Sequence, residues 1–270
     1  MNPVKKLKLH IHKKIYGKCR EMKEMPPLTQ YTLGDAEKLS LIYPVYVENK
    51  ESLSKIFNNI KLYESYSPEI LSNLNIIIVN DGSPITIDWP QFNLNFSVLN
   101  IRENIKWNSG GAKNLGVCFA ASERLLISDI DHTFPEETID FCMKVREKDN
   151  ILCFNQIEFY DDGRSENLHS PHPNIFFLTK SNYFYLNGYD EDFCGYYGDD
   201  IFFRKYLLHL FPNKVFIAPV DSYIHEFKEA FKLRRKLNCR RLLLLKRYNH
   251  SKDMLRFNFT LGTQFSYRCK

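Results

Sequence analysis

The sequence predicts a single α/β domain in which an open sheet carries helices on both faces. Apolar runs typical of strands alternate along the chain with amphipathic runs typical of helices. Two of the apolar runs end abruptly in turn formers and acidic residues, as strands of a parallel sheet do. The 270 residues, of which 44% are hydrophobic and 26% charged, suffice for one large hydrophobic core.

The first half of the domain has the order strand, helix, strand, strand, helix, strand. Residues 39–47 are an apolar, β-rich run, and residues 52–63 place apolar side chains on one helical face. Residues 74–79 form a continuous apolar run of the kind that is buried on both faces of a parallel sheet. The remaining elements of this half are a strand over 96–101, a helix over 110–122 that begins with two glycines, and a strand over 124–128.

The second half continues the alternation less regularly. We predict a helix over 136–148 and strands over 151–160 and 175–178. Within residues 187–204, a loop rich in glycine, aromatic residues and acids precedes a further helix. In such open α/β sheets, ligands bind beyond the carboxyl ends of the strands, so polar residues there are candidates for a site.

Two aspartates, Asp129 and Asp131, follow the strand predicted over 124–128. Alternate residues of an extended chain point to the same side, so the two carboxylates can be directed at one point. That arrangement suits a divalent cation and the phosphates that it carries. The alternative is a solvated acidic turn, because so short a motif recurs by chance. Asp81 occupies the corresponding position after the strand over 74–79.

The loop within 187–204 offers a second group of candidates. Asp199 and Asp200 stand at the start of a predicted helix, where the helix dipole favours acids, so they can be explained as a cap and a first-turn residue. The functional alternative is that the aromatic side chains between glycines form a shelf for a sugar ring. Asp200 would then lie beside the ring as a general base.

The net charge of +5 is distributed unevenly. Residues 1–30 hold eight Lys or Arg against two acids, residues 226–270 hold thirteen against three, and the stretch between them holds sixteen against twenty-seven. An acidic middle argues against a nucleic-acid surface, so we expect no nucleic acid as a partner. Residues 1–20 are either a solvated tail or a basic amphipathic helix that lies on an anionic membrane.

The sequence shows neither a candidate membrane span nor a signal peptide. No apolar stretch approaches the roughly 20 residues that cross a bilayer, and the lysine-rich start lacks the apolar segment of a signal peptide. The seven cysteines are scattered without a Cys-x-x-Cys pair, which is typical of reduced thiols. We therefore expect a cytoplasmic protein, peripheral to a membrane if its basic N-terminus binds one.

Five segments, in order along the chain, carry a resemblance to a known family. They are Tyr-Pro-Val-Tyr at 43–46, Ile-Ile-Val-Asn-Asp-Gly-Ser-Pro at 77–84, Asn-Ser-Gly-Gly-Ala-Lys-Asn-Leu-Gly at 108–116, Ser-Asp-Ile-Asp at 128–131, and Gly-Tyr-Asp-Glu with Gly-Tyr-Tyr-Gly-Asp-Asp within 188–204. Together they resemble the GT-A glycosyltransferases of family 2, including the branch shared with chondroitin synthases and the galactosyltransferase C-terminal domain. The resemblance runs from about residue 39 to residue 260, so the first 38 residues lie outside it.

The resemblance implies the GT-A fold, a Rossmann-like open mixed sheet flanked by helices, with basic extensions at both ends. Residues 39–135 would be the nucleotide-sugar-binding half, and residues 136–225 the acceptor-binding and catalytic half. Residues 1–38 would be a basic N-terminal extension, and residues 226–270 a basic C-terminal helix and tail.

For the nucleotide of the donor, the resemblance implies contacts from the first half. Pro44 and Tyr46 would line the base, and Asp81 would hold the base or the ribose. Lys113 would stand beside the diphosphate or ribose, in place of the family's usual arginine, where it acts as a point charge. Asn80 replaces the first of the family's paired aspartates, so the contact at that position stays open.

The resemblance also implies a metal site of Asp129, Asp131 and His225, with Asp129 shared between the metal and the ribose. Two carboxylates and an imidazole, together with phosphate oxygens, suit Mn²⁺, and Mg²⁺ is the alternative. His132, next to the aspartates, is the rival of His225 as a ligand.

On the acceptor side, Asp200 would be the catalytic base, and Tyr196, Tyr197, Gly198 and Asp199 would contact substrate. The base would take the proton of the acceptor hydroxyl in a single displacement with inversion. Tyr197 stands where the family usually has glycine and Asp199 where it usually has glutamate, and both changes would reshape the sugar or acceptor pocket.

The implied function is metal-dependent, inverting transfer of a hexosyl group from a nucleotide-diphosphate sugar to a hydroxyl of a glycan or polysaccharide. A UDP-sugar is the first choice of donor, with dTDP- and GDP-sugars behind it. The alternatives are a non-catalytic GT-A-like module that binds glycan or nucleotide, and a sugar nucleotidyltransferase. A nucleotidyltransferase would need a glycine-rich phosphate loop after the first strand, and residues 43–49 hold no glycine.

Overall fold

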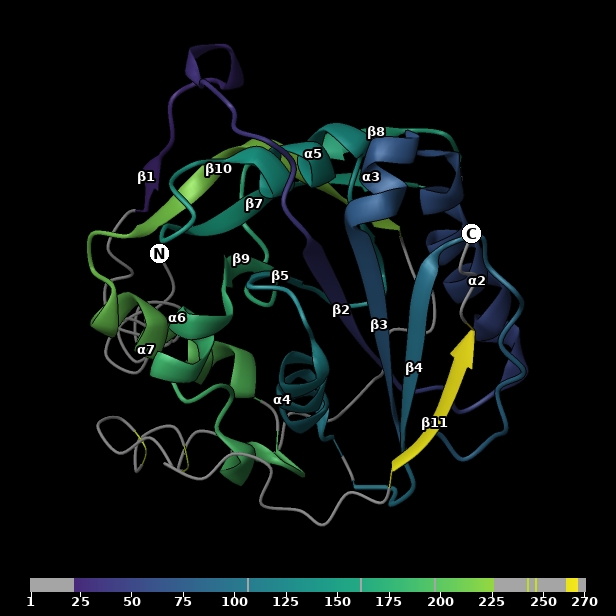
Figure 1. The fold of residues 1–270 in the computed structure, drawn as a ribbon. Coiled ribbons are helices and arrows are strands. Elements are labelled where there is room, and N and C mark those ends of the chain that lie inside the picture. Colours follow the sequence, from purple (N-terminus) through teal and green to yellow (C-terminus); the bar gives the residue numbers. More distant parts are fainter. Residues whose placement is uncertain are drawn as a thin grey trace.

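The computed structural model describes residues 22–105, 107–160, 162–196 and 198–225, together with Leu242, Lys246 and residues 261–266. Within these residues, eleven strands form one sheet that is flanked by helices (Figure 1). The strands are β1 (Lys23–Glu24), β2 (Leu39–Val45), β3 (Leu74–Asp81), β4 (Asn95–Ile101), β5 (Arg124–Ile127), β6 (His132–Thr133), β7 (Ile151–Phe159), β8 (Ser165–Asn167), β9 (Phe176–Thr179), β10 (Val215–His225) and β11 (Leu261–Ser266).

Six α-helices are described: α2 (Leu53–Lys61), α3 (Pro68–Asn73), α4 (Ser109–Phe119), α5 (Glu136–Lys144), α6 (Lys180–Tyr185) and α7 (Asp199–Leu210). The strands lie in the order β1-β10-β7-β9-β5-β2-β3-β4-β11, with β6 beside β10 and β8 beside β7. Strands β5, β2, β3 and β4 are parallel, whereas β9 runs antiparallel to both β5 and β7. The predicted open mixed sheet is therefore confirmed.

The sheet separates two hydrophobic layers, and β3 shows how its sequence builds both. Ile76 and Ile78 pack into one cluster, which includes residues of α2, α3 and α5. Ile77 and Val79 pack into the other, which includes residues of α4, α6 and α7. Because side chains alternate across a strand, a continuous apolar run fills both layers. The placement of α4 and α7 in one layer brings their N-termini to the same side of the sheet.

Most elements lie where the sequence predicts them, within a few residues. The exceptions are β10, an eleven-residue strand that was not predicted, and several short elements. Helices α3 and α6 have six residues each, too few for a clear helical period. Local signals start them: Pro68 opens α3, and the Thr179 side chain accepts a hydrogen bond from the Asn182 N–H at the start of α6.

Segments near both chain ends also join the sheet. β1, within the predicted N-terminal extension, pairs in parallel with β10, and β11 pairs antiparallel with β4 as an edge strand (Figure 1). The sequence places residues 261–266 in a basic tail and predicts no strand there. Residues 1–21, with the predicted membrane-binding helix, lie outside the described residues, as does most of the predicted C-terminal helix. No helix in the described part of the chain has the length and hydropathy needed to cross a membrane.

Candidate active site

The candidate residues gather at the edge of the sheet where β2, β3 and β5 end. Asp81 is the last residue of β3, and Asp129 and Asp131 follow β5. Strands β3 and β5 both pair in parallel with β2, so their carboxyl ends lie at one edge. This is the arrangement that the sequence predicts.

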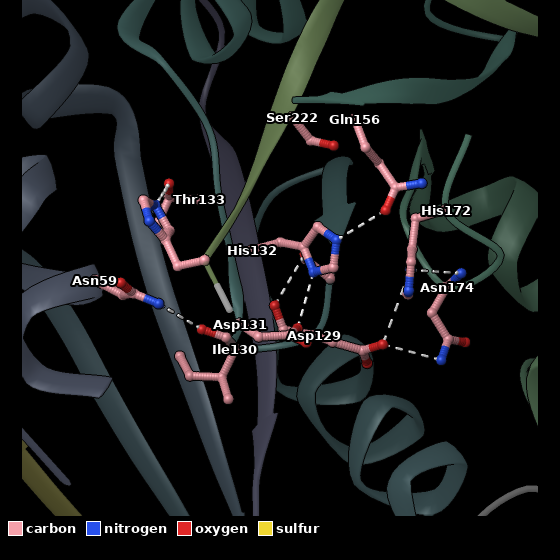
Figure 2. A network of polar contacts seen from close by, with 12 residues as sticks. Asn59, Asp129, Ile130, Asp131, His132, Thr133, Gln156, His172, Asn174 and Ser222 are labelled. Atoms are coloured by element: carbon pink, nitrogen blue, oxygen red, sulfur yellow. Dashed lines mark hydrogen bonds and ion pairs between the residues drawn. The ribbon is translucent and has the colours of Figure 1, made fainter. Parts of the chain in front are cut away.

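Asp129 is held by side chains from two segments, α4 and the loop before β9. Lys113 of α4, itself fully buried, places Nζ 2.8 Å from Asp129 Oδ1. Asn174 Nδ2 donates to Oδ2 at 3.0 Å, and His172 Nδ1 lies 4.0 Å from the same oxygen (Figure 2). Burial raises the pKa of Asp129, but Lys113 and His172 outweigh it and hold the pKa at about 2. Asp129 is therefore an anion at neutral pH, and both of its oxygens have protein partners.

Asp131 is directed toward His132 instead. His132 Nδ1 donates to Asp131 Oδ1 at 2.8 Å, and Nε2 lies 3.4 Å from Gln156 Oε1 (Figure 2). Burial lowers the pKa of His132, but the hydrogen bond and charge of Asp131 outweigh burial and raise it. Because both ring nitrogens face acceptors, His132 directs no lone pair at a cation in this arrangement. The Asp131 side chain is 38% exposed, so its carboxylate is accessible to a ligand.

His225 reaches the same place through strand pairing. It ends β10, which pairs antiparallel with β6, and its backbone N–H donates to the Asp131 carbonyl at 3.0 Å. Its Nε2 lies 2.9 Å from Thr133 Oγ1. Burial, followed by the charge of His132, lowers the pKa of His225, so the imidazole is neutral at neutral pH.

The carboxylate and imidazole groups near Asp131 are suitable ligands for a divalent cation, although they do not form a preassembled metal site. Among the described residues, no three His, Cys, Asp or Glu side chains are grouped closely enough to hold a metal ion. Asp131 and His225 nevertheless lie on paired segments and offer an accessible carboxylate and a neutral imidazole, which Mn²⁺ accepts as ligands.

The residues predicted to contact the nucleotide come from β2, β3 and the loops that follow them. Pro44 lies within β2, and the Tyr46 hydroxyl beyond it accepts a hydrogen bond from Asn104 Nδ2 at 3.3 Å. Asp81 is buried and accepts from Asn108 Nδ2 at 2.8 Å. Burial raises the pKa of Asp81 to about 7, although the hydrogen bonds of Asn108 oppose the shift.

Asn80 is engaged within the protein. Its Nδ2 donates to Asn100 Oδ1 at 3.0 Å, and its Oδ1 accepts from the Ser83 hydroxyl at 2.5 Å. The Ser83 hydroxyl also accepts from the Val47 N–H at 2.9 Å. This amide therefore joins the turns after β2 and β3.

Asp199 and Asp200 open α7, and both are buried. Gly198, with φ of 121°, is the N-cap, so the side-chain cap considered for these aspartates does not form. Trp107 Nε1 donates to Asp199 Oδ1 at 3.4 Å, whereas Asp200 Oδ1 has no hydrogen-bond partner among the described residues. Burial raises the pKa of Asp199, and burial followed by the charge of Asp199 raises the pKa of Asp200 to about 7. A buried carboxyl with this pKa has the properties of a general base.

The predicted aromatic shelf is described only in part. The Tyr196 side chain is 37% exposed, just before the buried aspartates of α7. Tyr197 lies outside the described residues. The Tyr196 ring is therefore partly accessible to solvent, and its contact with substrate stays a prediction.

Sequence reasoning missed several residues that hold the site together: Trp107, Asn108, His172, Asn174 and Tyr189. Tyr189 connects the partner of Asp129 with helix α7. Its hydroxyl donates to Asn174 Oδ1 at 3.3 Å, and its ring stacks on the Phe203 ring of α7 with 4.1 Å between the ring centroids. A local signal existed for some of these residues. His172 and Asn174 alternate with prolines in a Pro-His-Pro-Asn run, and polar residues in a stiffened loop are candidates for a site.

The comparison with protein families decides the class of this protein. The model of the family described as Glycosyl transferase family 2 matches residues 40–210, more than half of the chain. The chain belongs to glycosyl transferase family 2. Membership favours glycosyl transfer over the nucleotidyltransferase alternative, while the narrower resemblance to the chondroitin synthase branch stays a prediction. No curated protein matches the chain significantly.

Solved structures show the same fold at low sequence identity. TarS residues 1–349 from S. aureus has a TM-score of 0.51 and 16% identity, over 70% of this chain and 60% of that one. The same protein in complex with UDP-GlcNAc has a TM-score of 0.56 and 14% identity, over 80% and 68% of the two chains. The mannosyltransferase PcManGT from Pyrobaculum calidifontis, in complex with GDP-Man and Mn²⁺, has a TM-score of 0.51 and 16% identity, over 82% and 64%.

These likenesses confirm the predicted GT-A fold. The chain spans less than two thirds of the first TarS structure, at 60%, and of PcManGT, at 64%. The activity, substrates and partners of this family 2 member are therefore matters for proposal.

Proposed function

We propose that this glycosyl transferase family 2 member is a metal-dependent, inverting hexosyltransferase that uses a nucleotide-diphosphate sugar, in first place a UDP-sugar. Its acceptor would be a hydroxyl of a glycan or polysaccharide. The observation that carries the proposal is Asp200, a buried carboxyl whose Oδ1 has no hydrogen-bond partner among the described residues and whose pKa is raised to about 7. The charges of Asp129 and Lys113, on the donor side, both act on it.

Asp200 serves as the base that accepts the proton of the acceptor hydroxyl. A base works best when its pKa is close to the working pH, because it is then both partly ionised and still basic. Burial and the neighbouring Asp199 supply that pKa. Asp200 must lose its proton before it can act, so the rate of transfer should rise as the pH increases through about 7.

The first half of the domain binds the nucleotide of the donor. Pro44 and Tyr46 lie at the end of β2 and contact the base, and Asp81, at the end of β3, accepts hydrogen bonds from the base or ribose. Lys113, which is buried against Asp129, balances negative charge near the diphosphate. Tyr196, Gly198 and Asp199 contact the sugar or the acceptor, and the same role is proposed for Tyr197, outside the described residues.

The metal ligands proposed are Asp131 and His225, with Asp129 shared between the metal and the ribose. When bound, Mn²⁺ or Mg²⁺ would neutralise the charge of the departing nucleoside diphosphate. His132 holds the Asp131 carboxylate in place and keeps it oriented. Lys113 and Asn174 do the same for Asp129.

Two of the similar structures contain donors of the proposed class. The TarS structure is a complex with UDP-GlcNAc, and the PcManGT structure is a complex with GDP-Man and Mn²⁺. Both share the fold of this chain and differ in base, so they support a nucleotide-sugar donor without ranking the bases. Uridine stays the first choice for this protein, with dTDP- and GDP-sugars behind it.

A peripheral membrane contact through the basic N-terminus, and a cytoplasmic location, complete the proposal. The contact rests on the eight Lys or Arg among residues 1–30. Flotation with anionic liposomes, with and without residues 1–21, tests it. Equal flotation of both proteins would contradict a membrane role for that segment.

Nucleotide release from a panel of UDP-, GDP- and dTDP-sugars tests the reaction. We expect release with one class of donor in the presence of Mn²⁺ or Mg²⁺, loss of release with EDTA, and faster release when simple glycan acceptors are added. Nucleotide binding without release under every condition would indicate the non-catalytic module. A lack of both metal-dependent binding and turnover with every donor would contradict the proposal.

A further inference from the structure

Asn108 stands at the N-terminus of α4 but does not cap it. It occupies the N-cap position, where asparagine usually accepts hydrogen bonds from its own helix, yet its side chain makes no such bond. The side chain is nevertheless fully buried. A buried amide must find partners elsewhere, because unpaired polar groups in the interior are costly.

The Asn108 amide joins two parts of the site. Its Nδ2 donates to Asp81 Oδ1 at 2.8 Å, on the nucleotide side. Its Oδ1 accepts from the Cys194 thiol, with 2.9 Å between oxygen and sulfur, in the loop that leads to Asp200. A single orientation of the Asn108 amide makes both hydrogen bonds, since its NH₂ group faces the acceptor Asp81 and its oxygen faces the donor thiol of Cys194.

The two glycines after Asn108 leave room for this arrangement. A Cβ atom added to Gly111 would lie 2.2 Å from Asn108 Oδ1, far closer than atoms can approach. A Cβ atom added to Gly110 would lie 3.0 Å from Tyr189 Cβ and 3.3 Å from Asp199 Oδ2. The two glycines therefore allow the Asn108 side chain, Tyr189 and Asp199 to approach the backbone of α4 closely.

Trp107 strengthens the same connection. Its carbonyl accepts from the Gly195 N–H at 3.3 Å, and its indole N–H donates to Asp199 at 3.4 Å. Its φ of 50° lies in the left-handed region, which costs energy for a residue with a side chain. Residues 107–108 thus contact loop 194–200 at three points while Asn108 holds Asp81.

We infer that Asn108 is a positioning residue that sets Asp81, and with it the nucleoside diphosphate, in a fixed relation to loop 194–200 and the base at its end. The inference rests on the proposed roles of Asp81 and Asp200. A nucleotide sugar bound at Asp81 then lies at a fixed distance from the catalytic carboxylate of Asp200. Transfer requires such a fixed orientation of the reacting groups. Asn108 itself touches neither the sugar nor the acceptor in this assignment.

Substitutions can separate the two halves of the amide. Asn108→Asp keeps an acceptor for Cys194 but replaces the donor to Asp81 with a second carboxylate. We expect its affinity for UDP with Mn²⁺, measured by calorimetry, to fall about tenfold or more. Cys194→Ala removes only the loop contact, so UDP affinity should be unchanged while kcat for nucleotide release falls by about threefold or more, and Cys194→Ser should restore kcat because a hydroxyl donates again.

Asn73→Asp is the matched control. It makes the same chemical change in a half-buried residue at the end of α3, just before β3 and at the end of that strand opposite to Asp81. It should leave UDP affinity and kcat unchanged. Unfolding curves show whether each variant is folded. If Asn108→Asp does not fold, the kcat values of Cys194→Ala and Cys194→Ser test the inference without it.

The outcomes distinguish this inference from the proposed function. If the wild-type protein binds no nucleotide, the proposed function fails and the inference fails with it. If the wild-type protein binds UDP and the Asn108→Asp variant binds it equally well, the inference is overturned while the proposed function stands. Cys194→Ala with wild-type kcat would also overturn it.

Discussion

The raised pKa of Asp200 should affect both the stability of the fold and the rate of the proposed reaction as the pH changes. Its pKa is about 7 in the folded protein, against 3.8 for an ordinary aspartate, and burial followed by Asp199 is the cause. The folded state therefore keeps a proton that the unfolded state has lost, and the contribution of Asp200 to stability declines as the pH rises from about 4 to about 7. His172 acts in the opposite sense, because burial lowers its pKa to about 4 and stability is lost as the pH falls below about 6.5.

Comparison of Asp200→Asn with the wild-type protein isolates this contribution, since His172 is common to both. We expect the variant to unfold at a higher temperature above pH 7, by roughly 2–6 °C, and the difference to shrink toward pH 5. Thermal unfolding followed by circular dichroism at pH 5, 6, 7 and 8 measures it. Asp88→Asn, an exposed change in the loop between β3 and β4, is the control. An equal difference at every pH would contradict a raised pKa at Asp200.

At the scale of elements, the sequence predicts the strands of the central sheet because apolar runs and turn formers are local signals. It does not predict contacts between segments distant in the chain. For example, Asn174 donates a hydrogen bond to Asp129, 45 positions earlier in the chain. The hydrophobic pattern of the sequence carries no information about such a contact. The C-terminal segment gives another example, because Lys246 forms an ion pair with Asp190, 3.0 Å from its Oδ2, and also contacts Asp192.

The Lys246 ion pair ties the C-terminal segment to the loop before α7. The Asp190 side chain is fully buried, and Leu242 packs nearby against Phe193 and Phe202. Lys246→Met should lower the free energy of unfolding by about 2–4 kcal/mol, because it leaves buried carboxylate charge less compensated. Urea unfolding measures the change.

A double-mutant cycle tests whether that loss belongs to the ion pair. Adding Asp190→Asn should recover part of the stability lost in Lys246→Met, since the uncompensated charge is removed. Losses that simply add would show that the two side chains act independently.

At the scale of the whole molecule, the order of motifs along the chain predicts the GT-A fold, and the sheet explains why. Parallel strands β5, β2 and β3 bring Asp129, Asp131 and Asp81 to one edge although 48 to 50 positions separate the pair from Asp81. His225 joins them through the pairing of β10 with β6, which sequence reasoning reached only through the resemblance. Asn108 and Trp107 were missed because their partners lie in a loop whose path depends on the packing of α4 and α7.

The central claim divides the work of the site between Asp131, which helps to hold the donor, and Asp200, which accepts the proton of the acceptor. The most direct test measures Mn²⁺-dependent UDP binding and nucleotide release for Asp131→Ala and Asp200→Asn side by side. We expect Asp131→Ala to lose metal-dependent binding, and Asp200→Asn to bind UDP like the wild-type protein while kcat falls roughly 10²- to 10⁴-fold. Matched losses of binding and turnover in the two variants would contradict the assigned roles.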